Sequence, residues 1–125
     1  NLIERIKVLV ETHHARVSIY DWILERKTLQ LFYREQLMKL SPTELQIMSY
    51  FVRRPYHYVQ YIDLGYAVYG WEMSHKEAVR GLRAHISRLR EKLTRTTGHD
   101  NVLDIDTGNG LRFVPVTMPR HRIAN

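Results

Sequence analysis

The spacing of apolar residues divides the chain into segments with different expected structures. Residues 1–12 carry apolar residues at intervals of three and four, which predicts an amphipathic helix. This stripe consists of Leu2, Ile3, Ile6, Leu9 and Val10. Between residues 15 and 40 the apolar positions partly alternate with polar ones, and polar clusters at 25–27 and 34–36 indicate turns. This second pattern predicts a small antiparallel sheet of three or four strands.

A helix is predicted directly after this sheet, beginning in the stretch "SPTE". Ser41 can cap the helix, Pro42 suits its first position, and Glu44 completes a capping box. An apolar row follows, and Pro55 is expected to end the helix at about Arg54.

The remaining predicted elements are two more helices and a hairpin. The helices are predicted over residues 61–69 and 76–94, with a loop at 70–74. The stretches "VLDID" and "LRFVP" flank "TGNG", in which Asn109 and Gly110 form a strong signal for a hairpin turn. This order predicts an α+β fold of the winged helix-turn-helix type, with an N-terminal antiparallel sheet, a three-helix bundle and a C-terminal β-hairpin wing. The last helix of such a bundle enters the major groove of DNA.

The third predicted helix, within "HKEAVRGLRAHISRLREKL", combines an apolar stripe with many cations. At 100° per residue the stripe consists of Val79, Leu82, Ile86, Leu89 and Leu93. The opposite face carries Arg80, Ala84, Ser87, Arg88, Glu91 and Arg95. Arg83 and Arg90 flank one side of the stripe, and His85 flanks the other. Small residues in the middle let a helix lie close to a groove floor, where arginines reach guanine edges or phosphates. The alternative to a DNA-binding face is a charged face that only contacts solvent.

Length and charge sharpen this interpretation. A chain of 125 residues predicts one domain, and its net charge of +6 is typical of a nucleic-acid-binding protein without proving one. The segment 71–95 contributes +4 of this charge. The chain contains no cysteine, which excludes disulfides, and no apolar run of the roughly twenty residues that a membrane helix needs.

An enzyme is not expected from this sequence. Residues 108–110 form a hairpin turn too short to be a phosphate-binding loop, and no Ser/His/Asp arrangement stands out. The seven histidines lack the spacing of metal ligands, so neither a metal nor a cofactor is expected. A winged helix that binds protein instead of DNA remains an alternative, as does a transcription activator of the same fold that lacks a phosphorylated receiver domain.

Three motifs resemble those of a known family. "LSPTE", "AHISRLREKL" and "GNGLRF" follow one another as in the OmpR/PhoB-type winged-helix DNA-binding (effector) domain of bacterial two-component response regulators. The resemblance covers residues 15–115 and divides the chain into a DNA-binding domain at 15–125 and an amphipathic helix and linker at 1–14, which resembles the end of a preceding receiver domain. It implies a cytoplasmic bacterial protein that binds double-stranded DNA at promoter direct repeats, with a second copy head-to-tail. It also implies contact with RNA polymerase.

The resemblance also implies roles for individual residues. The residues that it places at the DNA bases are Arg88, Ala84, Arg83 and Gly81. Those that it places at phosphates are Arg80, His85, Arg90, Ser87, which stands where many members have a basic residue, and Tyr69, which stands where tryptophan is common. The loop before the recognition helix carries Trp71, Glu72 and Met73, which the resemblance places at polymerase or another partner. Packing on the core is the alternative for Trp71 and Met73.

The wing departs from the family pattern. In the family a basic residue just before the hairpin turn often reaches the minor groove, but this chain has Asp106 and Thr107 there. Thr107 is therefore a candidate only for a phosphate contact, and the wing is expected to add little affinity. Arg112, beyond the turn, is expected to point toward the helices.

Overall fold

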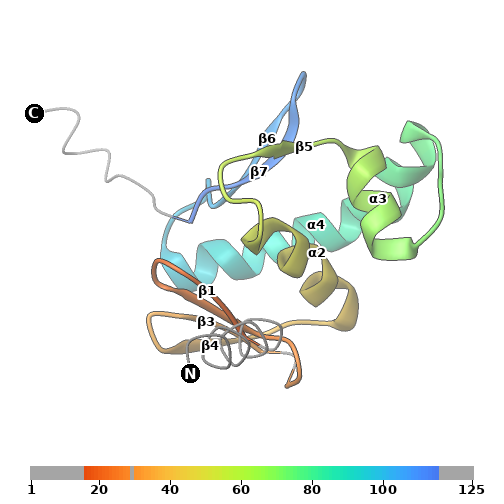
Figure 1. The fold of residues 1–125 in the computed structure, drawn as a ribbon. Coiled ribbons are helices and arrows are strands. Elements are labelled where there is room, and N and C mark those ends of the chain that lie inside the picture. The colour runs from red at the N-terminus through yellow and green to blue at the C-terminus, as the bar shows by residue number, and fades with distance from the viewer. Residues whose placement is uncertain (1–15, 29, 116–125) are drawn as a thin grey trace, which may run out of the picture.

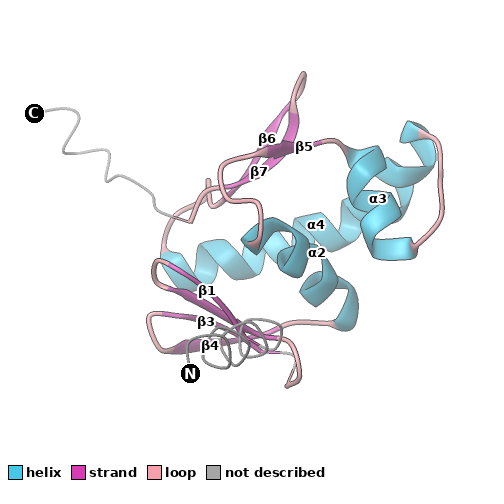
Figure 2. Ribbon diagram, in the orientation of Figure 1, coloured by secondary structure: helices cyan, strands magenta, loops and turns pink. Residues whose placement is uncertain are grey.

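The computed structural model describes residues 16–28 and 30–115 and places three helices between two antiparallel sheets (Figures 1 and 2). The sheet near the N-terminus covers one side of the helices, and the wing sheet lies on the other side (Figure 1). The helix predicted over residues 1–12 and the division at residue 15 lie outside the described residues.

The N-terminal sheet has four strands in the order β1-β2-β3-β4. They are β1 (Arg16–Ile19), β2 (Trp22–Glu25), β3 (Gln30–Tyr33) and β4 (Gln36–Lys39). The strand prediction is therefore confirmed at its upper limit. Residues of β2, β3 and β4 face the core: Trp22, Leu24, Leu31 and Met38 are buried. The indole of Trp22 donates a hydrogen bond to the carbonyl of Pro115 at 3.0 Å, which ties this sheet to the chain beyond the wing.

The three predicted helices are present as α2 (Pro42–Val52), α3 (Tyr61–Tyr69) and α4 (His75–Thr97). The predicted capping box at Ser41 and Glu44 is confirmed. α4 is longer than predicted at both ends, because Ser74 and Glu77 form a second capping box and Gly98, with φ of 78°, provides a left-handed C-cap.

The predicted apolar stripe of α4 needs one correction. Leu82, Ile86, Leu89 and Leu93 are buried as expected, but the stripe begins at Ala78, which is 0% exposed, and Val79 is only half-buried. The cause is a close crossing with α3: a Cβ added to Gly65 would lie 3.2 Å from the Cβ of Ala78. Small residues on both helices allow this approach, which brings Ala78 rather than Val79 to the centre of the contact.

The wing is a three-stranded sheet in the order β5-β7-β6, not a simple hairpin. The predicted strands are β6 (Leu103–Asp106) and β7 (Gly110–Phe113), and the added strand is the two-residue β5 (Tyr58–Val59). Gly110 has φ of 105°, and a Cβ there would lie 2.3 Å from the carbonyl oxygen of Val59. Only glycine therefore allows β7 to begin this close to β5.

Arg112 does not point toward the helices, so that expectation is wrong. Its neighbours Leu111 and Phe113 are fully buried in the core, and alternation along β7 places Arg112 on the opposite face of the wing. There its guanidinium lies over the ring of Tyr58, 4.6 Å from the centroid, and donates to Asp104 at 3.2 Å. Tyr58 and Asp104 are the cross-strand neighbours of Arg112, so Arg112 links the three strands of the wing on its outer face.

Candidate nucleic-acid interface

The outward face of α4 is the candidate interface. The exposed side chains and glycine along it are Arg80, Gly81, Arg83, Ala84, Ser87, Arg88, Glu91 and Arg95. The leucines and Ile86 on the other side of α4 pack on the core. Successive turns of the helix therefore present the same face to solvent. Every base-reading residue expected from the sequence is thus exposed on this face, together with Arg80 and Ser87.

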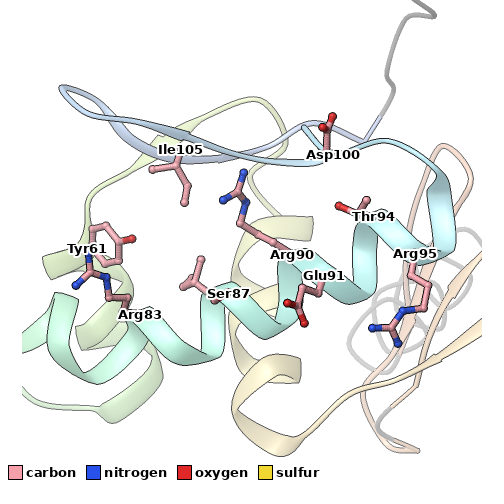
Figure 3. A pocket seen from close by; sticks show the side chains of 10 residues that line it. Tyr61, Arg83, Ser87, Arg90, Glu91, Thr94, Arg95, Asp100 and Ile105 are labelled. Carbon is pink, nitrogen blue, oxygen red and sulfur yellow. The ribbon is translucent and has the colours of Figure 1, made fainter.

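A cleft runs along one side of this face, between α4 and the wing (Figure 3). Arg83, Ser87 and Arg95 line it from α4, and Ile105 reaches in from β6 with 41% of its surface exposed. Arg90 points from α4 toward the wing, where its Nε donates to the carbonyl of Leu103 at 3.0 Å (Figure 3). Arg90 therefore bridges the helix and the wing, and only its terminal nitrogens are left for a ligand.

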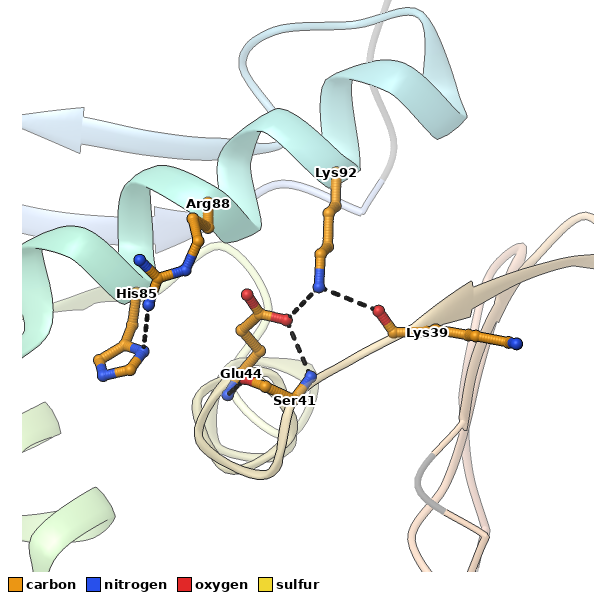
Figure 4. Close-up of polar contacts among 6 residues, drawn as sticks. All are labelled: Lys39, Ser41, Glu44, His85, Arg88 and Lys92. Carbon is orange, nitrogen blue, oxygen red and sulfur yellow. Dashed lines mark hydrogen bonds and ion pairs between the residues drawn. The ribbon is translucent and has the colours of Figure 1, made fainter.

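On the other side of α4, His85 and Arg88 form a pair (Figure 4). Arg88 Nη2 lies 3.0 Å from Nδ1 of His85, a geometry in which the neutral imidazole accepts a hydrogen bond from the guanidinium. Because His85 is half-buried, this contact limits the positions that the exposed Arg88 side chain samples. An arginine held in place in this way loses less conformational entropy when it binds a base edge.

Lys92 does not belong to the exposed face, although the sequence counts it among the cations of this helix. Its Nζ lies 2.5 Å from Oε1 of Glu44 and donates to the carbonyl of Lys39 at 3.1 Å (Figure 4). Glu44 is only 1% exposed. Burial raises the pKa of this carboxyl, but hydrogen bonds from Lys92 and from the Ser41 backbone outweigh burial, so the pKa lies below its usual value. Lys92 thus fixes α4 against the start of α2.

The sequence contained a signal for this contact that the helix prediction missed. Glu44 lies three, four, seven and eight residues before the buried positions Ile47, Met48, Phe51 and Val52. A residue at that spacing faces the core, so a capping glutamate there needs a cation within reach.

The expected phosphate contact Tyr69 is engaged within the protein. Its hydroxyl donates to the carbonyl of Gly81 at 2.8 Å, which links the end of α3 to the exposed face of α4. Tyr69 as a whole remains 38% exposed.

The side chains of the loop at residues 70–74 lie in two different environments. Trp71 is 53% exposed and Glu72 is also exposed, whereas Met73 is half-buried. A Cβ added to Gly65 would lie 2.8 Å from the Met73 sulfur, so Met73 packs on α3. Of the two alternatives for this loop, core packing therefore applies to Met73, and Trp71 and Glu72 are available to a partner.

The wing tip consists of an exposed Thr107 and a turn held by Asp106. The carboxylate of Asp106 accepts hydrogen bonds from the backbone N–H of Gly108 and Asn109, at 3.2 and 2.9 Å, and from the side chain of Asn109 at 2.9 Å. Asp106 is therefore a turn-forming residue. The side chain of Gln60 adds a hydrogen bond to the carbonyl of Asn109 at 3.0 Å, which ties the wing tip to the start of α3.

Within residues 16–28 and 30–115, no group of three or more histidine or acidic side chains is placed to hold a metal ion. No helix in the same part of the chain is long and apolar enough to cross a membrane.

A protein-family model described as "Transcriptional regulatory protein, C terminal" matches residues 34–113. The chain belongs to this family. The predicted resemblance to OmpR/PhoB-type domains is thereby confirmed, and the family is one of transcription regulators, not of enzymes. Comparison with curated protein sequences gives no match.

Solved structures confirm the winged-helix fold. The DNA-binding domain of the response regulator AdeR, in complex with an intercistronic region, is 21% identical with a TM-score of 0.64, over 78% of this chain and 97% of that chain. The DNA-binding domain of CpxR from E. coli is 19% identical with a TM-score of 0.65, over 79% and 95%. The Klebsiella pneumoniae RstA DNA-binding domain, in complex with the RstA box, is 18% identical with a TM-score of 0.66, over 82% and 100%.

Proposed function

We propose that this domain regulates transcription by sequence-specific binding of double-stranded DNA, with α4 in the major groove. The observation that carries the proposal is the exposed face of α4, where the small residues Ala84 and Ser87 lie between exposed arginines. A helix with this profile can approach the groove floor closely while its arginines reach bases and phosphates. The AdeR and RstA domains, whose fold this chain shares, were solved in complex with DNA.

We propose a role for each of the residues that the family resemblance singles out. Arg88, Arg83, Ala84 and Gly81 face the bases from the centre of α4. Arg80, Ser87, His85 and the terminal nitrogens of Arg90 contact phosphates on the two flanks of the groove. Thr107 offers a hydroxyl to a phosphate from the wing tip, and Tyr69 contacts the DNA backbone if it exchanges its hydrogen bond with Gly81.

The same proposal extends to assembly. Two copies bind direct repeats in a promoter head-to-tail, and Trp71 and Glu72 contact RNA polymerase from the exposed part of the loop before α4. Residues 1–14 connect the domain to a preceding receiver domain. The protein acts in the cytoplasm, without a cofactor and without catalytic activity of its own.

A salt titration of duplex binding tests the proposal. About five phosphate contacts give a slope near −4 to −5 in a plot of log affinity against log salt concentration, because bound phosphates release counterions. Fluorescence anisotropy with a labelled duplex measures this slope. A flat response would instead favour a winged helix that serves only protein–protein interaction.

Two substitutions on α4 test the assignment of roles. Arg88→Ala is expected to weaken binding to the preferred site by about 1–3 kcal/mol and to relax base preference. Arg90→Ala is its control and should weaken preferred and random duplexes about equally, since it removes a phosphate contact and the link to Leu103. Unchanged affinity of Arg88→Ala for both duplexes would mean that another residue reads the bases.

A further inference from the structure

A second basic surface lies away from α4, in a groove between α2, α3 and the β2–β3 turn. We call it the α2–α3 groove and define it by Arg26, Lys27, Tyr50, Arg53, Arg54 and Tyr66. None of the residues that line it belongs to α4 or to the wing. The groove is therefore separate from the proposed DNA interface and can be occupied independently of it.

The charge of the α2–α3 groove is not compensated by the residues around it. In the described part of the chain, none of its four cations forms an ion pair, and no carboxylate lines it. Burial, and then the nearby charges of Arg26 and Arg54, lower the pKa of Arg53. Cations gathered in this way repel one another, and an acidic partner relieves that repulsion.

The groove also contains two tyrosine rings, beside the polar side chains of Gln46 and Ser49. The Arg54 guanidinium lies 3.9 Å from the centroid of the Tyr50 ring and donates to the Tyr50 carbonyl at 3.2 Å, so both side chains are held in place. Tyr66 of α3 is 55% exposed, and Leu45 and Ala67 also line the groove. Tyrosine rings and aliphatic side chains next to a basic rim match a partner that brings apolar and acidic residues together. Duplex DNA offers only the acidic part.

The elements around the groove favour a helix as the partner. An extended peptide binds by adding to a free sheet edge, but β2 and β3 are inner strands whose neighbours on both sides are paired. The groove is lined by Gln46 and Tyr50 of α2 and by its C-cap residue Arg53, which are spaced by four and three residues, so it follows about two turns, or ~10 Å, of this helix. Side chains of a second helix interdigitate with such a row.

We propose that the α2–α3 groove docks an amphipathic helix of a partner protein. Carboxylates of that helix face Arg26, Lys27 and Arg53, and its apolar row packs on Tyr50 and Tyr66. Because DNA occupies α4, the domain holds this partner while it is bound to its site.

The experiment uses the full chain and a fluorescein-labelled probe peptide of about sixteen residues, long enough to form a helix. Leucines at helical spacing form one face of the probe and glutamates flank them. A second peptide with glutamine in place of each glutamate is the control. The acidic peptide is expected to bind at least about tenfold more tightly than the glutamine peptide, because three charge contacts of moderate strength are lost.

Two triple variants with equal charge locate the binding. Arg26→Gln/Lys27→Gln/Arg53→Gln is expected to weaken binding of the acidic peptide about tenfold. The control, Arg16→Gln/Arg34→Gln/Lys39→Gln, removes three exposed cations outside the groove and should change it less than about twofold. Tyr66→Ser, on a side chain already exposed, should weaken it about threefold through lost apolar contact.

Several outcomes overturn the proposal. If the two triple variants weaken binding of the acidic peptide equally, the peptide is attracted by the overall charge of the protein and not by the groove. A larger loss of duplex affinity in the groove variant than in the control means that the groove serves nucleic acid. A dimer that the groove variant dissociates, seen by sedimentation, identifies a second copy as the occupant. Absence of peptide binding, whether the groove takes no helix or is filled by residues 1–15, also contradicts it. The salt slope and the Arg88→Ala result test DNA binding separately.

Discussion

Two helices of this domain begin with the same pattern, yet their glutamates have opposite environments. In α2 and in α4 a serine caps the helix and a glutamate three residues later closes the capping box. The backbone N–H of the serine lies 2.9 Å from the glutamate Oε1 in both boxes. Glu44, however, is 1% exposed and paired with Lys92, whereas Glu77 is exposed and has no ion pair among the described residues.

The difference shows which property is local and which depends on the tertiary structure. The capping box fixes the first residue of each helix through contacts within four residues. The pKa of Glu77 is lowered by these local contacts, first by the hydrogen bond from the Ser74 backbone. The pKa of Glu44 is lowered in spite of burial, because a cation on a distant helix reaches it. One box therefore only starts a helix, and the other also joins α2 to α4.

The largest effect is expected when Glu44 loses its cation. Lys92→Met leaves the buried Glu44 carboxylate unpaired and should lower the free energy of unfolding by about 3 kcal/mol, the lower end for such pairs because Lys92 is 33% exposed. Arg80→Met, next to the exposed Glu77, should change it by less than about 0.5 kcal/mol. Urea unfolding measures both values.

Duplex binding should give the reverse order for the same two variants. Arg80→Met removes a proposed phosphate contact, whereas folded Lys92→Met keeps the exposed face of α4. Equal stability losses in the two variants would show that the Lys92 contact adds nothing beyond a surface ion pair.

The pattern of apolar residues predicts the helices and the longer strands, because burial follows the repeats of helix and strand. The strand β5 was missed since two residues are too few to show alternation, and its pairing with β7 is a tertiary contact. Ala78 and not Val79 begins the buried stripe of α4, because α3 crosses α4 closely at Gly65. The spacing of residues within α4 does not reveal this crossing.

In the candidate site, too, one property could be predicted from the sequence and another could not. Exposure of Arg83, Ala84 and Arg88 follows from helical geometry and could be predicted. The partners of individual side chains could not, because the carbonyl groups that hold Arg90 and Tyr69 belong to other elements. The sequence of a helix therefore gives the number of its cations, and the fold decides which of them a ligand can reach.

A smaller effect is expected from the two capping serines. Ser41→Ala and Ser74→Ala each remove the acceptor for a helical N–H and should each lower stability by about 1 kcal/mol. Only Ser74→Ala should also weaken duplex binding, up to about fivefold, because the first turns of α4 must then be ordered on binding. Lys92 still holds the start of α2 in Ser41→Ala. Thermal unfolding and anisotropy measure the two effects, and a similar affinity loss in Ser41→Ala would mean that the boxes are equivalent.

The smallest effect is a pH dependence that only the buried box should show. Lys92 lowers the pKa of Glu44, so its contribution to stability is complete above the unfolded pKa and is lost as the pH falls through the folded pKa. In Lys92→Met the folded pKa of Glu44 is higher, and the carboxyl takes up a proton more readily as the pH falls. The stability difference between the native chain and Lys92→Met should therefore shrink when the pH is lowered from about 6.5 to about 4. The difference for Arg80→Met should stay nearly constant over this range, since the Glu77 carboxylate still accepts from the Ser74 backbone N–H and the Glu77 backbone N–H still donates to Ser74 Oγ. Urea unfolding at several pH values measures both, and a Lys92→Met deficit that is independent of pH would show that Lys92 stabilises the fold through packing and its bond to the Lys39 carbonyl instead of through the charge of Glu44.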